Sequence, residues 1–131
     1  MRHHVLIAML CLAVPATASA QSMARGKYIV EQTSLCNDCH TPRDDKGALI
    51  MSKELQGAPL GVQPIHPMPW ADTAPPIAGL PGHYTPAQMV EFLQTGKRPD
   101  GSSVRPPMPP YRFSKQDAVA VTAYIRTLKQ Q

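Results

Sequence analysis

The positions of the apolar residues predict three helices separated by long irregular segments. The clearest helical spacing lies near the C-terminus and consists of Ala118, Val121, Ile125 and Leu128. Ser114 and Asp117 precede these apolar residues in a pattern similar to a capping box, so we expect the last helix to begin after Ser114. Arg126 and Lys129 suit the negative end of the helix dipole.

A middle helix is predicted from the segment Thr85-Pro86-Ala87-Gln88. Thr85 suits the N-cap, Pro86 suits the first helical position, and Gly96 suits the end of the helix. We expect its buried side to consist of Met89, Phe92 and Leu93. Residues 47–76 are rich in Gly and Pro, which predicts irregular loop with room for a short hairpin.

Residues 23–32 predict a first helix that Ser22 can cap. Its apolar surface consists mostly of Met23, Tyr28, Ile29 and Val30. Gly26 is costly within a helix unless a neighbouring element needs its missing side chain. We expect the C-terminal helix to cross the first helix there, and the alternative is a tolerated glycine in a frayed first turn.

The N-terminus has the three parts of a secretory signal peptide. Arg2 supplies a positive charge, residues 5–14 supply an apolar segment of ten residues, and Ala18-Ser19-Ala20 supplies an A-x-A cleavage site. A membrane span needs about 20 apolar residues, so this segment is too short for an uncut anchor. A lipid anchor on Cys11 is disfavoured because Leu10 stands where a small residue should precede it. We expect residues 1–20 to be removed, and residues 21–131 to form one small domain with no membrane span.

The run Cys36-Asn37-Asp38-Cys39-His40 has the C-x-x-C-H spacing of covalent haem c attachment. The two cysteines lie about one helical turn apart, so each sulfur can bond one haem vinyl group, and His40 can then bind the iron. A redox dithiol is one alternative, but it usually follows a β-strand, whereas residues 23–35 predict a helix. A zinc site is another, but it needs about four ligands, and these are the only cysteines outside the signal segment.

The second axial position decides whether a haem here transfers electrons or binds small molecules. Met108 is the first candidate because it lies within Pro106-Pro107-Met108-Pro109-Pro110, just before the last helix. The four prolines restrict φ on both sides and predict a stiff, extended segment that presents the thioether. Met89 is better explained as core of the middle helix. The alternatives are an open sixth position, Met68, His66 and His83.

Composition and charge narrow the function classes further. Thirteen of the 15 prolines lie between Pro59 and Pro110, where they lower the entropy of the unfolded chain and help to fix loops around a large apolar group. The formal net charge is +4, or +3 without Arg2, and no nucleic-acid-binding fold accompanies it, so a nucleic-acid partner is poorly supported. Only two thiols are left after the signal segment, and haem uses both.

With these residues placed, the chain resembles a class I cytochrome c with one haem. More narrowly, it is similar to the haem domains in cytochrome subunits of periplasmic alcohol, aldehyde and gluconate dehydrogenases. The similar segments are Gly26-x-Tyr28-Ile29, Cys36-x-x-Cys39-His40-Thr41-Pro42, Gly96-x-Arg98-Pro99-Asp100-Gly101 and Met108-Pro109. The resemblance implies an all-α cytochrome c fold with crossing N- and C-terminal helices and long Pro-rich loops around one covalent haem. The chain departs from those subunits in having one haem motif instead of three, and Pro76-Ile77-Ala78 instead of Asn-Ile-Thr.

We therefore expect a periplasmic electron carrier and not an enzyme. Cys36 and Cys39 would hold haem c, and His40 and Met108 would bind its iron. The resemblance implies redox proteins as partners, such as a quinoprotein or flavoprotein dehydrogenase and a terminal oxidase. Two other interpretations stay open: a haem enzyme with an open sixth position, peroxidase-like or oxidising sulfur compounds, and a cytochrome subunit bound to a dehydrogenase.

Charged and polar side chains suggest two secondary roles. Trp70 and Arg98 are the first candidates for holding the haem propionates, since an indole N–H and a guanidinium both suit a carboxylate. Basic residues flank the end of the middle helix and Met108 and could steer an acidic partner toward the haem edge. They are Lys97, Arg98, Arg105, Arg112 and Lys115. An ordinary solvated surface is the alternative explanation of these charges.

Overall fold

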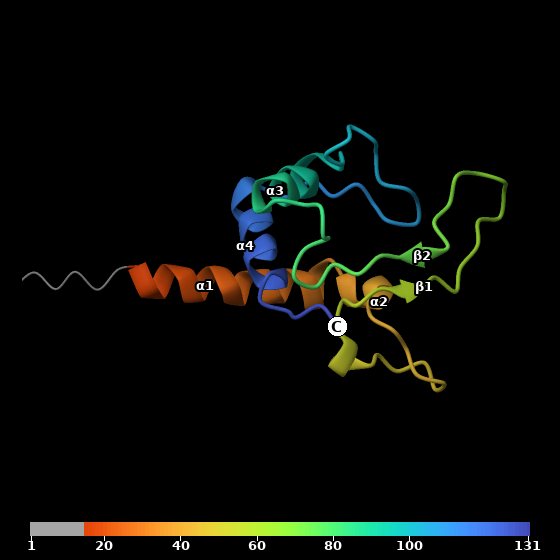
Figure 1. Ribbon diagram of the computed structural model, residues 1–131, viewed down its shortest axis with the longest axis horizontal. Coiled ribbons are helices and arrows are strands. Elements are labelled where there is room, and N and C mark those ends of the chain that lie inside the picture. The colour runs from red at the N-terminus through yellow and green to blue at the C-terminus, as the bar shows by residue number, and fades with distance from the viewer. Residues whose placement is uncertain (1–14) are drawn as a thin grey trace, which may run out of the picture.

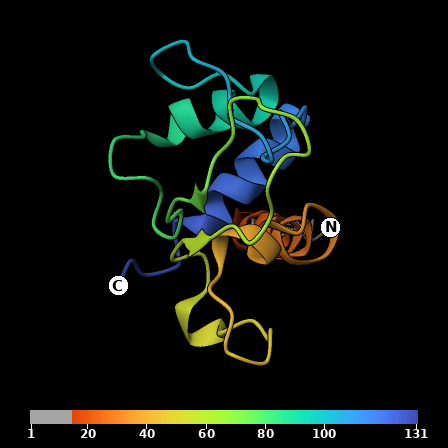
Figure 2. The same ribbon diagram turned by 90° about the vertical axis from the view of Figure 1, so that its right-hand side faces the viewer.

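The computed structural model describes residues 15–131 (Figure 1). Its elements in chain order are helix α1 (Pro15–Tyr28), π-helix η1 (Ile29–Thr33), helix α2 (Cys36–His40), 3-10 helix η2 (Met51–Lys53), strands β1 (Ala58–Pro59) and β2 (Thr73–Ala74), and helices α3 (Pro86–Thr95) and α4 (Lys115–Ile125). Helix α4 crosses α1 steeply, and α3 lies on the opposite side of α1 from η2 (Figures 1 and 2). The predicted all-α class is confirmed.

The first helix begins earlier than the sequence pattern predicts. Helix α1 starts at Pro15, eight residues before the predicted start, and Ser22 lies inside it. The prediction that Ser22 caps this helix is therefore wrong. Residues 16–24 contain four alanines, and alanine is the strongest helix former, which explains the extension. The charged and apolar parts of the predicted signal peptide fall within residues 1–14, outside the described residues.

The crossing of α1 and α4 depends on Gly26. A Cβ atom at this position would lie 2.0 Å from the Ala120 carbonyl oxygen and 2.6 Å from its carbon, so no side chain fits there. The close approach of the C-terminal helix is thus confirmed as the reason for this glycine. Around the crossing, Ile29, Val30 and Val121 are buried in one apolar core.

Helix α3 has the start and end that its sequence predicts. The Thr85 side chain accepts a hydrogen bond from the Gln88 backbone N–H, and the Gln88 side chain accepts one from the Thr85 N–H. Gly96 ends the helix with φ +70°, a left-handed conformation that favours glycine. The predicted buried side is confirmed, and it consists of Met89, Phe92 and Leu93.

Helix α4 also begins as predicted, because the Ser114 side chain accepts a hydrogen bond from the Asp117 N–H at 3.1 Å. The helix ends at Ile125, so Leu128 and Lys129 lie beyond it. Leu128 still packs against the core, but Lys129 is not in the last helical turn, and its predicted role at the helix dipole is wrong.

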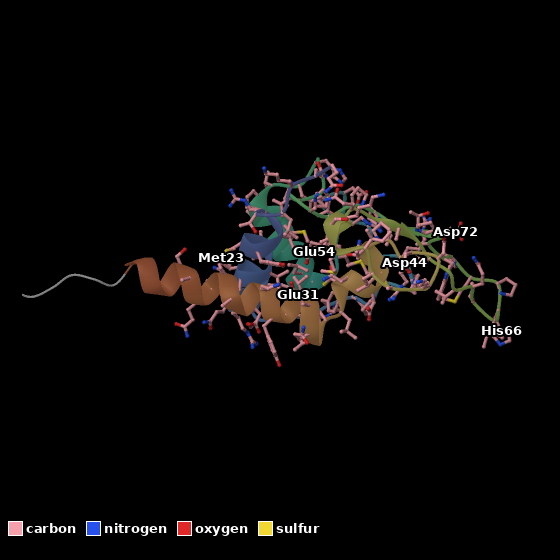
Figure 3. All side chains as sticks on the ribbon, turned by 90° about the horizontal axis from the view of Figure 1, so that it is seen from below. Met23, Glu31, Asp44, Glu54, His66 and Asp72 are labelled. Carbon is pink, nitrogen blue, oxygen red and sulfur yellow. The ribbon has the colours of Figure 1, made fainter. Side chains whose placement is uncertain are left out.

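The loop region contains the short hairpin for which the sequence left room. Strands β1 and β2 pair antiparallel, with Ala58 opposite Ala74. The loop between them extends away from the helices, and His66 lies at its far end (Figure 3). Leu55 and Ala78, on either side of the hairpin, are fully buried in the helical core. The hairpin base is therefore fixed to the helices, while its tip projects into solvent.

We predict that Gly26→Ala lowers the free energy of unfolding by about 3 kcal/mol or more, because the new methyl group would overlap the Ala120 carbonyl. Helix propensity alone would give the opposite sign. Gly82→Ala is the matched control, since nothing lies within 4 Å of a Cβ there, and its stability should stay within about 1 kcal/mol of the wild type. Urea denaturation measures both variants. A Gly26→Ala protein as stable as the control would contradict the crossing.

Candidate haem-attachment site

The chain enters α2 through two unusual backbone conformations. The N–H of Ser34 donates to the Ile29 carbonyl at 2.8 Å, which closes the π-helix η1. Leu35 then adopts a left-handed conformation with φ +51°, which is rare for residues other than glycine. Such conformations persist where the surrounding structure fixes them, and they cluster at functional sites. The sharp turn at Leu35 sets the direction of α2.

Both predicted haem-bonding cysteines lie on α2 as free thiols, with Cys36 half-buried and Cys39 exposed. Burial raises the pKa of the Cys36 thiol to about 11. A redox dithiol needs the opposite shift, because its first cysteine must ionise readily. Within residues 15–131, no three His, Cys, Asp or Glu side chains gather as they would around a zinc ion. Both thiols are free on one short helix, which is compatible with covalent attachment of haem.

His40 is held in one orientation by the residue that follows strand β2. Its side chain is buried, and Nδ1 lies 2.7 Å from the Pro75 carbonyl oxygen. Burial lowers the pKa of His40, which favours the neutral ring. A neutral ring that donates from Nδ1 carries its lone pair on Nε2, the atom that can bind a metal.

Gly57 allows this arrangement. Its N–H donates to the His40 carbonyl at 2.7 Å, and its φ is +85°. A Cβ atom at Gly57 would lie 2.8 Å from the Pro76 nitrogen, so a side chain would push the Pro75 segment away from His40. Neither Gly57 nor Pro75 stands out in the sequence, where both belong to a Gly- and Pro-rich stretch that predicts only loop.

Met108 is half-buried and packs against the helical core. The segment around it is not extended as predicted, since it turns at Pro106 and Pro107, whose shared peptide bond is cis. Proline fixes φ but leaves ψ free, so four prolines do not make a straight segment. At the turn, the Pro106 carbonyl accepts a hydrogen bond from the Ala71 N–H at 2.8 Å. This bond joins the methionine segment to the base of the hairpin loop.

The alternative ligands lie in other surroundings. Met89 is 4% exposed and belongs to the core of α3, as predicted. Met68 is 49% exposed, and His66 and His83 are exposed as well. A thioether that binds iron must be shielded from competing water, and among these candidates Met108 is the half-buried side chain outside a helix.

The two suggested propionate partners already have protein partners. The indole N–H of Trp70 donates to the Val62 carbonyl at 3.0 Å, and an indole has one such donor. Arg98 donates to the Ser103 carbonyl at 2.6 Å but has further N–H groups free to bind an anion. Arg98 and Arg105 also line an open surface pocket of about 550 Å³ that reaches Pro106. Arg98 is therefore the better candidate of the two.

A polar network ties α2 to the crossing of α1 and α4. Asn37 is 6% exposed, and its Nδ2 donates to Glu54 Oε1 at 3.2 Å while its Oδ1 accepts from the Thr41 hydroxyl at 3.0 Å. The Tyr124 hydroxyl lies 3.2 Å from the same Glu54 oxygen and 3.0 Å from Glu31 Oε1. Figure 3 shows the two glutamates close together. Nothing in the sequence pattern points to this network, because Tyr124 lies 93 residues from Glu31 and 70 residues from Glu54.

The Tyr124 hydroxyl joins three parts of the chain. Burial raises the pKa of Tyr124, and its hydrogen bond to Glu31 raises it further, so the phenol keeps its proton. A phenol has one proton and donates to one of the two carboxylates at a time. Lys27 forms an ion pair with Glu31. The network thus fixes α2 against both α1 and α4.

Comparison with known proteins agrees with this geometry. The family model for cytochrome c matches residues 23–129. The chain therefore belongs to the cytochrome c family, whose members carry covalently bound haem c and transfer electrons. The residues present fit that group, because two free thiols lie one turn apart and the adjacent imidazole is buried, neutral and fixed through Nδ1.

Two curated relatives are longer than this chain. One is the fructose dehydrogenase cytochrome subunit of Gluconobacter japonicus, 29% identical over an alignment of 113 residues that covers 79% of this chain and 21% of that protein. The other is a diheme cytochrome c-type protein of Cereibacter sphaeroides, 29% identical over an alignment of 107 residues that covers 78% of this chain and 34% of that protein. The chain thus spans a fifth to a third of these relatives and resembles the cytochrome subunits of dehydrogenases.

We predict that Asn37→Ala lowers the free energy of unfolding by about 1–3 kcal/mol, because it removes two hydrogen bonds of a buried side chain, one to Glu54 and one from the Thr41 hydroxyl. Asp38→Ala is the matched control within the same motif. Its carboxylate forms a surface pair with Arg43, with side chains 49% and 45% exposed, and its loss should change stability by less than about 0.5 kcal/mol. Urea denaturation of the haem-carrying proteins compares them. Equal effects of the two variants would contradict the network.

Proposed function

We propose that this protein is an exported, periplasmic one-electron carrier with one haem c. Cys36 and Cys39 would hold the macrocycle, and His40 and Met108 would be the ligands of its iron. The observation that carries the proposal is the buried His40 ring, oriented by the Pro75 carbonyl and directly following two free thiols on one helix. When bound, the haem supplies a centre that cycles between ferrous and ferric states.

The residues around this centre have separate tasks. The hydrogen bond from His40 Nδ1 to Pro75 fixes the ring and raises the basicity of the ligating nitrogen. Met108 supplies a thioether, a ligand that raises the reduction potential in electron carriers. Met108 packs against the apolar core, which would shield the thioether from water on that side. No side chain is needed as a general base or nucleophile.

The proposed location follows from the N-terminal sequence. Residues 1–20 have the charge, apolar segment and A-x-A site of a signal peptide. Haem c is attached outside the cytoplasm, so export and the C-x-x-C-H motif support each other. Among residues 15–131, no helix combines the length and apolar character needed to cross a bilayer.

The similarity to a fructose dehydrogenase cytochrome subunit supports a periplasmic quinoprotein or flavoprotein dehydrogenase as electron donor, and a terminal oxidase is the proposed acceptor. Docking would be weak and transient, as redox encounters usually are. Basic groups near the end of α3 are suited to steer an acidic partner. Lys97 and Arg112 are exposed there, although each also forms a hydrogen bond within the protein, to Ser103 and to the Thr95 carbonyl.

We predict that the ferric wild-type protein has a six-coordinate, low-spin spectrum with the weak far-red band of a sulfur–iron bond, and that Met108→Ala loses this band. Met68→Ala is the matched control, because Met68 is exposed on the hairpin loop, and its spectrum should equal that of the wild type. Visible absorption of the purified proteins measures both. A high-spin wild-type protein that binds cyanide or peroxide readily would instead favour a haem enzyme with an open sixth position.

A further inference from the structure

One hydrogen bond joins the methionine segment to the chain that leads into the haem motif. The Tyr111 hydroxyl donates to the Ser34 carbonyl at 2.7 Å, across 77 residues of sequence. Tyr111 lies three residues after Met108, and Ser34 lies two residues before Cys36. The two halves of the proposed haem site, which come from opposite ends of the chain, are therefore connected directly at this point.

The Tyr111 ring is fixed by its neighbours. It stacks on Phe113 with 4.8 Å between the ring centroids and 21° between the planes. The Phe113 N–H donates to the Leu93 carbonyl at 3.2 Å, so this stack is attached to α3. Burial, with smaller contributions from the Cys36 and Cys39 thiols, raises the pKa of Tyr111 to about 12. The hydroxyl is therefore protonated at neutral pH and can donate to the Ser34 carbonyl.

Met108 consequently lies between two anchors. On its N-terminal side, the Pro106 carbonyl accepts the hydrogen bond from the Ala71 N–H. On its C-terminal side, the Tyr111 hydroxyl is bonded to Ser34. Of these two anchors, only that of Tyr111 reaches the segment that carries the cysteines. Once Cys36 is bonded to haem, Ser34 lies only two residues from the attachment point, so the Tyr111 hydrogen bond links the methionine segment to the chain next to the cofactor.

We propose that Tyr111 is a positioning residue that holds Met108 in place as the sixth ligand. The inference rests on the proposed function, because it takes Met108 as that ligand. A thioether binds ferric iron weakly, so the ligand is kept by confining its segment near the iron and not by the strength of the bond. The Tyr111 hydroxyl is bonded to Ser34 when the segment is seated, so the hydrogen bond favours the ligated state over the released one.

The competing explanation is that this hydrogen bond contributes only to overall stability. Tyr124 provides the matched control, since its hydroxyl also bonds groups distant in sequence, Glu31 and Glu54, but belongs to the helix crossing and not to the methionine segment. Tyr111→Phe and Tyr124→Phe each remove one hydroxyl and keep the ring. The two variants therefore separate ligand retention from general stability.

The experiment uses the ferric, haem-carrying full chain and adds cyanide, which can bind only after Met108 leaves the iron. We expect Tyr111→Phe to bind cyanide roughly three- to tenfold faster than the wild type, the range that one net hydrogen bond gives. We expect its far-red band to disappear at a lower urea concentration than global unfolding requires. Tyr124→Phe should lower the urea midpoint of unfolding and leave the cyanide rate within about twofold of the wild type.

Two results would overturn the positioning role. A Tyr111→Phe protein with the wild-type cyanide rate and an unchanged far-red band would do so directly. Faster cyanide binding in both variants, in proportion to their loss of stability, would also overturn it. The faster binding would then come from lower overall stability and not from the methionine segment. A wild-type protein without the far-red band would instead overturn the assignment of Met108 as ligand, and the positioning role with it, so the two failures are distinguishable.

Discussion

At the crossing of α1 and α4, the Gly26 backbone lies so close to the Ala120 carbonyl that no side chain fits between the two helices. Because the helices approach this closely, Ile29, Val30 and Ile125 share one buried core directly before the C-x-x-C-H motif. The same approach places the Tyr124 hydroxyl beside Glu31 and Glu54, and Glu54 bonds Asn37 within α2. The position of the haem-bonding helix therefore depends on a contact made by a residue without a side chain.

The rest of the site is completed by groups from distant parts of the chain. The Pro75 carbonyl orients His40 from 35 residues away, and the Tyr111 hydroxyl reaches Ser34 across 77 residues. With haem bonded to α2 as proposed, each of these contacts would position a part of the chain relative to the cofactor. Long loops with little regular structure can thus hold a well-defined metal site, provided that a few hydrogen bonds fix their ends. A fold of a few helices and long loops agrees with the chain's membership of the cytochrome c family.

The sequence predicted those features that depend on neighbouring residues. The capping box at Thr85, the end of α3 at Gly96 and the start of α4 at Ser114 are local, and all three are confirmed. Gly26 was predicted as a crossing point because its cost within a helix needs a compensating contact. The start of α1 does not follow from the cap pattern, because Ser22 is a plausible cap, whereas the alanines before it extend the helix through propensity alone. The Pro75 and Tyr124 contacts could not be found, since nothing in the sequence pattern pairs residues across such distances. The roles of Cys36, Cys39, His40 and Met108 stay predictions of the motif and its spacing.

We propose that one iron, with His40 and Met108 as ligands, carries one electron at a time. A potentiometric titration of the protein from the periplasmic fraction, followed by visible absorption, tests this proposal. We expect a single reversible one-electron transition, with one haem per chain and a low-spin spectrum in both oxidation states. Several transitions, or a high-spin ferric state that takes up an external ligand during the cycle, would contradict it.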